Sequence, residues 1–301
     1  MEGSQSSHSA PMEPSEHLES ALPGSSAEAV KTDDCGSAIT SPTLTSWDQI
    51  RPLFHRFQHK DRDGNIVEKR AELWYHEEEG NIFHGHVSEP VRDVSLEQAS
   101  ACLRRIPSEH VYPLAPAGIS VYAADTKNRF EAVHMKWPDV TPYYDEITSH
   151  TEVADRFLMQ AKALECVREH PHRHVVEFKG CVVRKNRIVA LAIRRYRAHL
   201  ESLMKCRDRY DRATKLALLT KVRSAVEHLH VLGLAHNKVT PYAVMIDDQN
   251  EPVLTAFDYC STVGDDLMPR RWEDGREDFD HVSSLKNDEM GLERLEKWLG
   301  L

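Results

Sequence analysis

The stretch GLAHNKVTPYAVMIDDQNEPVLTAFDYCSTVG, residues 233–264, constrains the fold of this chain more than any other. An apolar helical pattern ends just before it, and its first glycine predicts the helix end because glycine readily adopts the left-handed backbone that closes a helix. Two short apolar runs, VMI and VL, follow with the polar turn DDQN between them, which predicts a β-hairpin. The loop before the hairpin holds His236, and the loop after it begins at Phe257.

This layout resembles the catalytic centre of the protein kinase family, in which a loop H-R-D-x-x-x-x-N precedes a hairpin and D-F-G follows it. His236 stands at the His of the first motif, and Phe257 stands at the Phe of the second. Pro241 matches a proline that is common in that loop. Ala256 follows His236 by twenty positions, which fits the family's spacing between its two acidic centres.

The residues that carry phosphoryl transfer in that family are replaced here. One Asp accepts the substrate proton, and an Asn and a second Asp hold magnesium. The matching positions are Lys238, Ala243 and Ala256. A charged lysine cannot accept that proton, and alanine offers no oxygen to a cation that prefers oxygen ligands. Asp258 follows two places late, and because an extended chain would displace its carboxylate by several ångströms, we do not expect it to substitute.

Upstream segments match the small lobe of the family. LAPAGISVYAA stands for the glycine-rich hairpin but keeps only Gly118, and EAVHMKW resembles V-A-I-K, which makes Lys136 the lysine that contacts nucleotide phosphates. The Glu that pairs with this lysine falls on Gln160, or on Ala161 with a one-residue shift. Ile193 lies near the position that guards the nucleotide pocket. The resemblance therefore implies weak ATP binding at most and no cofactor or metal; alternatively, Lys136 is an exposed strand lysine.

Three histidines alternate in HPHRHVVEFKGCVV, at His170, His172 and His174. Alternating histidines on a strand can bind a metal. The segment also resembles the HPNIV-x-x-x-G segment that leads into the fourth strand of the kinase small lobe, where the first His-Pro packs a loop. We favour this packing interpretation because no acidic or cysteine partner stands at a suitable spacing.

Two helices are expected near the end of the chain. ATKLALLTKVRSAVEHLHVLG places Leu216, Leu219, Val222, Val226 and Leu229 on one face. SLKNDEMGLERLEKWLGL has a second apolar face and resembles the central helix of the kinase large lobe. Its Asp288 then stands where the family's carboxylate binds the backbone of the catalytic loop. An acidic residue near a helix N-terminus is also favoured by the helix dipole, and both roles are compatible.

The sequence predicts an α+β chain with a two-lobed, protein-kinase-like fold. Residues 1–44 are poor in aromatics and predicted to be a disordered tail. Residues 45–108 form a small ordered extension, in which SWDQIRPLFHRFQ is expected to be an amphipathic helix. Residues 109–301 form the kinase-like domain, with a β-rich small lobe at 109–197. The large lobe, 198–301, is expected to be shortened, because the family's later helices have no counterpart.

Composition and charge argue against several other classes of protein. The formal charge of −10 argues against a general nucleic-acid binder. No apolar run approaches the roughly 20 residues that span a bilayer, and the N-terminus lacks the apolar core of a secretory signal. We therefore expect no membrane partner and an intracellular protein, cytoplasmic or nuclear. The six cysteines form no C-x-x-C pair and are expected to be reduced thiols.

The resemblance covers about residues 110–301, and the chain also looks like a compact kinase-like group common in filamentous fungi. It implies a pseudokinase that binds or scaffolds an unidentified protein partner. The alternative is an active Ser/Thr protein kinase or small-molecule phosphotransferase that uses ATP and recruits Asp258, Asp247 or Asp248 for magnesium. A third interpretation is a switch that binds ATP without hydrolysing it.

Overall fold

The computed structural model describes residues 41–51, 56–60, 66–77, 81–88, 91–123, 133–140, 151–203, 210–267 and 281–301. The chain divides into two units, residues 1–39 and 40–301, and the described residues belong to the second. Helices and small antiparallel sheets are mixed along it, so the α+β class is confirmed. Within the described residues, no helix combines the length and the apolar character needed to cross a membrane.

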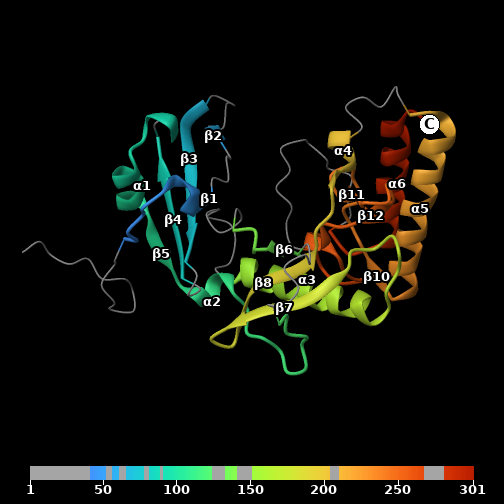
Figure 1. Ribbon diagram of the computed structural model, residues 1–301, viewed down its shortest axis with the longest axis horizontal. Coiled ribbons are helices and arrows are strands. Elements are labelled where there is room, and N and C mark those ends of the chain that lie inside the picture. Colours follow the sequence, from blue (N-terminus) through green and yellow to red (C-terminus); the bar gives the residue numbers. More distant parts are fainter. Residues whose placement is uncertain are drawn as a thin grey trace, which may run out of the picture. The chain divides into compact units, whose positions relative to one another are not determined.

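The first part of the described chain is a five-stranded antiparallel sheet (Figure 1). Its strands are β1 (Ile50–Arg51), β2 (Arg56–Lys60), β3 (Ile66–His76), β4 (Ile82–Val87) and β5 (Arg104–Ile106). They are ordered β1-β3-β4-β5, and β2 also pairs with β3. Helix α1 (Leu96–Cys102) packs on β4, and Leu44, which the sequence assigns to the tail, is buried in the same apolar cluster.

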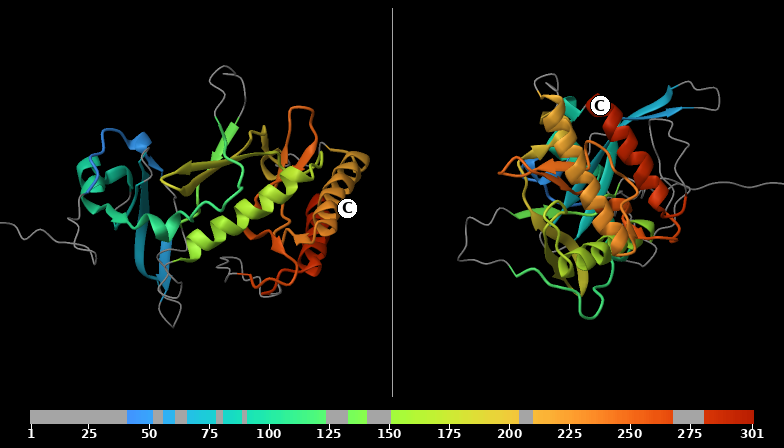
Figure 2. Two further views of the ribbon diagram at one scale, coloured as in Figure 1. Left: turned by 90° about the horizontal axis from the view of Figure 1, so that it is seen from below. Right: turned by 90° about the vertical axis from the view of Figure 1, so that its right-hand side faces the viewer.

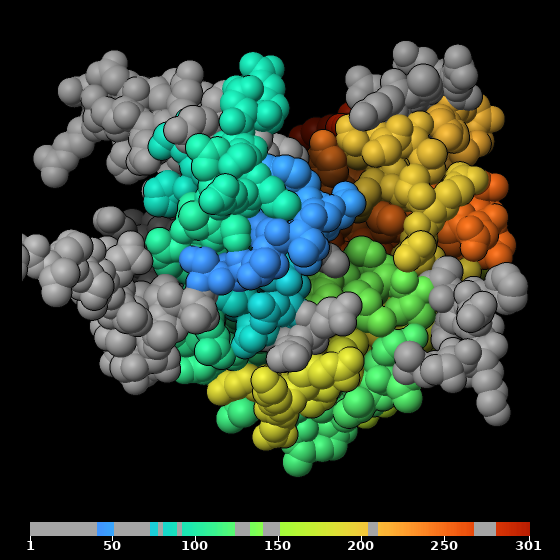
Figure 3. Space-filling model, turned by 60° about the vertical axis from the view of Figure 1, so that its left-hand side comes forward, coloured from blue at the N-terminus to red at the C-terminus, as the bar shows by residue number. Residues whose placement is uncertain are grey.

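The prediction of an amphipathic helix at SWDQIRPLFHRFQ is wrong. Trp47–Gln49 form a single 3-10 turn, which the side chains of Ser46 and Gln49 cap reciprocally. The chain then enters β1, where Ile50 pairs with Tyr75 of β3 and is buried. The blue chain of residues 41–51 accordingly lies against the teal sheet in Figure 3. Pairing with β3 and burial of Ile50 outweigh the helical periodicity, because secondary-structure propensity is a weak prior against tertiary contacts.

Only the first part of the segment LEQASACLRRI, residues 96–106, is helical. Ser95 and Gln98 form a capping box at the start of α1, and the helix ends at Cys102. The remaining Arg104–Ile106 form β5, because Ile106 pairs with Ile82 on the edge of β4. Strands β3 and β4 pair antiparallel, from Ala71 opposite Val87 to His76 opposite Ile82.

A three-stranded sheet follows, with the order β6-β8-β7, and helix α3 lies along it (Figure 2). The elements are α2 (Ser108–Val111), β6 (Val133–Lys136), α3 (Glu152–Glu169), β7 (Phe178–Arg184) and β8 (Arg187–Arg194). Helix α2 runs across the predicted domain boundary between residues 108 and 109. A buried cluster that includes Trp74, Val111, Val153 and Val189 joins the first sheet to α2, α3 and β8.

The last part of the chain holds two long helices and short antiparallel strands. These elements are β9 (Ala198–His199), α4 (Leu200–Leu203), α5 (Arg212–Val231), β10 (Leu234–Ala235), β11 (Val244–Ile246), β12 (Pro252–Leu254), β13 (Ser261–Thr262) and α6 (Leu285–Leu299). Helices α5 and α6 lie side by side (Figures 1 and 2). The predicted β11–β12 hairpin is confirmed, and Gly233 has the expected positive φ of 75° just after α5.

The apolar face of α5 is nearly as predicted. Leu219, Val222, Val226 and Leu229 are buried, but Leu216 is 40% exposed. One continuous core joins the β6-β8-β7 sheet, α3, α5, the β11–β12 hairpin and α6. The loop between β10 and β11, which holds His236, therefore runs between buried elements on both sides.

Candidate functional site

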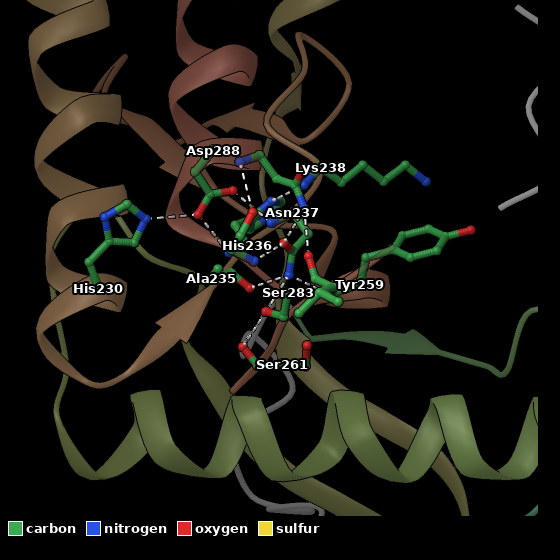
Figure 4. A network of polar contacts seen from close by, with 12 residues as sticks. His230, Ala235, His236, Asn237, Lys238, Tyr259, Ser261, Ser283 and Asp288 are labelled. Carbon is green, nitrogen blue, oxygen red and sulfur yellow. Dashed lines mark hydrogen bonds and ion pairs between the residues drawn. The ribbon is translucent and has the colours of Figure 1, made fainter. Parts of the chain in front are cut away.

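Asp288 of α6 organises the loop that follows β10 (Figure 4). Its side chain is fully buried. One carboxylate oxygen accepts the backbone N–H of His236 at 2.8 Å and the ring Nε2–H of His230 at 2.9 Å. The other accepts the backbone N–H of Asn237 at 2.6 Å. The sequence placed Asp288 at the backbone of this loop, and the structure has it there.

Asn237 is the centre of the same network, and sequence reasoning missed it. Its backbone is left-handed, with φ of 58°, which Asn tolerates better than most residues. The side chain is fully buried, and its amide oxygen accepts hydrogen bonds from the Ser284 backbone and the Asn287 side chain. Its amide nitrogen donates to the Ala235 carbonyl, the Tyr259 carbonyl and the Ser283 hydroxyl. The sequence feature that could have identified it is its position directly after the motif residue His236, because Asn is a residue type that favours turns.

His236 is a buried structural residue in a defined tautomer. Its Nε2–H donates to the Thr255 carbonyl at 2.7 Å, and its Nδ1 accepts the Lys238 backbone N–H at 3.3 Å. Only a neutral ring can donate at one nitrogen and accept at the other. Burial lowers the pKa of His236, against the opposing charge of Asp288, and so favours this neutral form. The ring also meets Phe257 edge-on at 5.4 Å, so the two motif residues pack together.

Lys136 of β6 forms an ion pair with Asp258, and Nζ lies 2.5 Å from Oδ1. Both side chains are about three-quarters buried, so Lys136 is not the exposed strand lysine of the alternative interpretation. The expectation that Asp258 would be carried away along an extended chain is wrong. Ala256 has a left-handed backbone, with φ of 60°, and Phe257–Tyr259 then form one turn of 3-10 helix. This turn directs Asp258 towards β6, because a compact turn replaces the extended spacing.

Asp258 is held between cations. Burial by itself raises the pKa of its carboxyl, but the ammonium groups of Lys136 and Lys238 outweigh burial and lower the pKa to about 2. Lys238 Nζ also lies 5.0 Å from the centre of the Tyr259 ring, and the Arg156 guanidinium lies 5.2 Å from that ring. Asp258 is therefore ionised at neutral pH and already neutralised by protein groups.

The other positions matched to kinase motifs do not join this cluster. Ala243 is buried, and its carbonyl accepts both the N–H and the hydroxyl of Thr255. Gln160 is buried in α3. Gly118 has a positive φ of 82°, and Ile193 lies opposite His134 in the β6–β8 ladder. A carboxylate of α3 that does reach the upstream loop is Glu165, which accepts the backbone N–H of Ser120 at 3.1 Å.

The alternating histidines lie in a loop and not on a strand. The ring of His172 stacks on that of His228, with centroids 4.9 Å apart, and His174 Nδ1 lies 2.8 Å from the Pro252 carbonyl oxygen. His172 also contacts the Ser224 hydroxyl at 3.3 Å and accepts the backbone N–H of His174 at 3.2 Å, so the histidines pack among protein groups. Across the part of the chain that the structure describes, no three His, Cys, Asp or Glu residues are grouped so that they could hold a metal ion.

Comparison with known proteins adds no relative: no protein-family model matches this sequence, and no curated protein matches it.

Proposed function

We propose that this chain is a kinase-like protein that binds a protein partner and does not transfer phosphate. The order of its elements supports the kinase resemblance. A sheet ordered β6-β8-β7 has α3 between its first two strands in the sequence, and α5, the polar loop, the β11–β12 hairpin and α6 follow. The bonds from Asp288 to the loop backbone are a further feature that the resemblance implies. The two residues at motif positions, His236 and Phe257, also pack together.

One observation carries the absence of transfer: Asp258, the carboxylate that pairs with Lys136, is already held by the ammonium groups of Lys136 and Lys238. Magnesium would have to displace Lys136 from this carboxylate, and the methyl groups of Ala243 and Ala256 offer it no further oxygen. Lys238 supplies a cation at the position where the kinase family has its base. A positioned general base alone contributes about 10²–10⁴-fold to rate, so its loss together with that of the metal ligands leaves little transfer.

A second candidate is an active phosphotransferase that uses Asp258 as its metal ligand. The observation that favours it is the 3-10 turn at Phe257–Tyr259, because this turn returns the carboxylate to the side of Lys136. In kinases the corresponding lysine and metal-binding Asp both act at the nucleotide phosphates. Bound ATP would then draw Lys136 onto its phosphates and free Asp258 for magnesium.

Phosphate transfer from labelled ATP separates the two candidates. The full chain, Asp258→Asn and Asp93→Asn are compared with magnesium present. Asp93 is the control because it is 58% exposed and lies in the 3-10 turn Val91–Asp93, outside every position matched to a kinase motif. We expect no transfer from any of the three to a general protein substrate, to the chain itself or to small-molecule acceptors. Transfer by the wild type and Asp93→Asn that is lost in Asp258→Asn would overturn the proposal and establish the second candidate.

Nucleotide binding is measured separately by thermal shift with ATP, with and without EDTA. A ligand present well above its Kd must raise the melting temperature, so an unchanged temperature at millimolar ATP excludes the nucleotide-switch interpretation. The binding role itself predicts that the wild-type chain, captured from its native cells, carries a stoichiometric protein partner. Recovery of the chain alone would remove that part of the proposal.

A further inference from the structure

A pocket of about 110 Å³ lies between the first sheet and the β7–β8 hairpin, away from the cluster around Asp258. It is lined by polar residues, among them Asn81, Arg105, Ser108, Arg184, Lys185 and Arg187. The yellow hairpin of β7 and β8 and the teal-to-green chain that precedes β6 lie side by side on the face shown in Figure 3. Four of these lining residues are cationic in a chain whose formal charge is −10.

The four cations are not neutralised by the described protein. Within the described residues, no carboxylate forms an ion pair with Arg105, Arg184, Lys185 or Arg187. Arg184 and Arg187 are moreover direct partners in the β7–β8 ladder. Like charges directly opposite each other across a ladder are destabilising. A bound anion would relieve this repulsion.

Two of the four cations, Arg187 and Arg105, are held at the pocket by hydrogen bonds within the protein. Arg187 donates to the Tyr112 carbonyl at 2.7 Å, and Arg105 donates to the Asn81 side-chain oxygen at 3.1 Å. Each guanidinium has five N–H donors, so most remain for a ligand. Lys185 lies in the hairpin turn with a left-handed backbone, φ 46°. The turn places Lys185 directly after Arg184, which pairs with Arg187 across the ladder, and the side chains of Arg184 and Lys185 are exposed.

From this arrangement we infer that the pocket binds a phosphate dianion, either free or as the monoester on a phosphoserine side chain. Pockets that enclose drug-sized ligands have volumes of about 300–1,000 Å³, so this pocket accommodates one compact group and not a whole nucleotide. Arginine forks match phosphate oxygens with two hydrogen bonds each. Three arginines and a lysine favour two negative charges over the single charge of a carboxylate. This inference is independent of the proposed function.

The test is isothermal titration of the full chain with sodium phosphate and with O-phosphoserine, at an ionic strength held constant with sodium chloride. Arg184→Gln/Lys185→Gln removes two exposed cations of the pocket. Arg92→Gln/Lys286→Gln removes two exposed cations elsewhere and is the matched control. We expect the wild type and the control to bind equally, and the pocket variant to bind at least tenfold more weakly. Arg105→Gln, also exposed, is expected to weaken binding in the same direction.

Each outcome decides the inference. Binding of both ligands identifies free phosphate as sufficient, whereas binding of O-phosphoserine alone identifies the phosphorylated side chain as the ligand. Absence of binding to either ligand at concentrations on the order of 10 mM would overturn the inference. Equal affinities of the pocket variant and the control variant would also overturn it, because binding would then depend on overall charge alone. Unfolding midpoints of all variants, measured in parallel, confirm that each is folded.

Discussion

Removing the Asp288 carboxylate should destabilise the chain more than almost any other single change near the site. Asp288→Ala leaves the backbone N–H groups of His236 and Asn237 buried without an acceptor. Each buried donor that loses its partner costs about 1–3 kcal/mol, so the two together cost about 2–6 kcal/mol. His230 also loses its partner, but its side chain is 19% exposed and can turn to water, so it adds less.

This loss is large against the total free energy of unfolding, which is about 5–15 kcal/mol for a typical protein. Asp288→Asn keeps the shape of the side chain but presents one amide oxygen and one NH2 group. One of the two backbone donors then faces another donor, and we expect a loss of about 1–3 kcal/mol. The free energy of unfolding should therefore increase in the order Asp288→Ala, Asp288→Asn, wild type, because the number of hydrogen bonds that the side chain accepts increases in that order.

Urea denaturation, followed by circular dichroism and tryptophan fluorescence, measures these free energies. Glu289→Gln is the control, because it changes an exposed carboxylate on the neighbouring position of α6. If Asp288→Ala falls within about 0.5 kcal/mol of this control, the loop does not depend on the carboxylate and the reasoning is refuted. A larger loss of unfolding free energy for Asp288→Asn than for Asp288→Ala would also contradict the reasoning.

Three further predictions concern the same region. The lowered pKa of Asp258 means that its interactions with Lys136 and Lys238 together contribute roughly 2 kcal/mol above pH 4, and this contribution is lost as the pH falls towards 2. The stability difference between wild type and Asp258→Asn, measured by urea denaturation, should therefore shrink below pH 4, and a constant difference would count against these ionic contacts. Gly291→Ala should lower stability by about 1–3 kcal/mol despite the better helix propensity of alanine, because the new Cβ would lie 2.8 Å from the Val239 Cβ and 2.9 Å from the Val239 carbonyl oxygen. An unchanged thermal midpoint would show that the loop around Val239 moves to accommodate the methyl group. Ala256→Gly should raise the unfolding free energy by about 0.5–1 kcal/mol, since glycine adopts the left-handed backbone without strain; a decrease would show that the methyl contacts outweigh the strain.

Much of the local structure near the site could be predicted from short-range signals. Gly233 marked the end of α5, and the apolar runs around DDQN marked the β11–β12 hairpin, because each depends on neighbouring residues alone. The same kind of signal failed at Ile50, where helical spacing concealed a strand that exists because it pairs with Tyr75, a partner distant in the sequence. Short elements at sheet edges are decided by such partners and not by their own periodicity.

The candidate site was predicted in part. The sequence drew attention to Lys136 and Asp288, but it treated Asp258 as displaced, because the left-handed backbone at Ala256 leaves no mark in the sequence. Asn237 was overlooked because its importance comes from five hydrogen-bonding partners contributed by several segments. The pocket at the β7–β8 hairpin was also missed, since its cations lie on segments separated by about 80 residues.

The sequence alone determined which chemical groups are present: a lysine and two alanines stand where the kinase resemblance expects a base and metal ligands, and no fold can add those oxygens. It also determined the helices and the hairpin whose signals are local. Tertiary structure alone decided that Asp258 meets Lys136, that Asn237 is enclosed and that four cations share one pocket. These features depend on distances between segments far apart in the chain, which are set by packing and backbone turns rather than by any single stretch of residues.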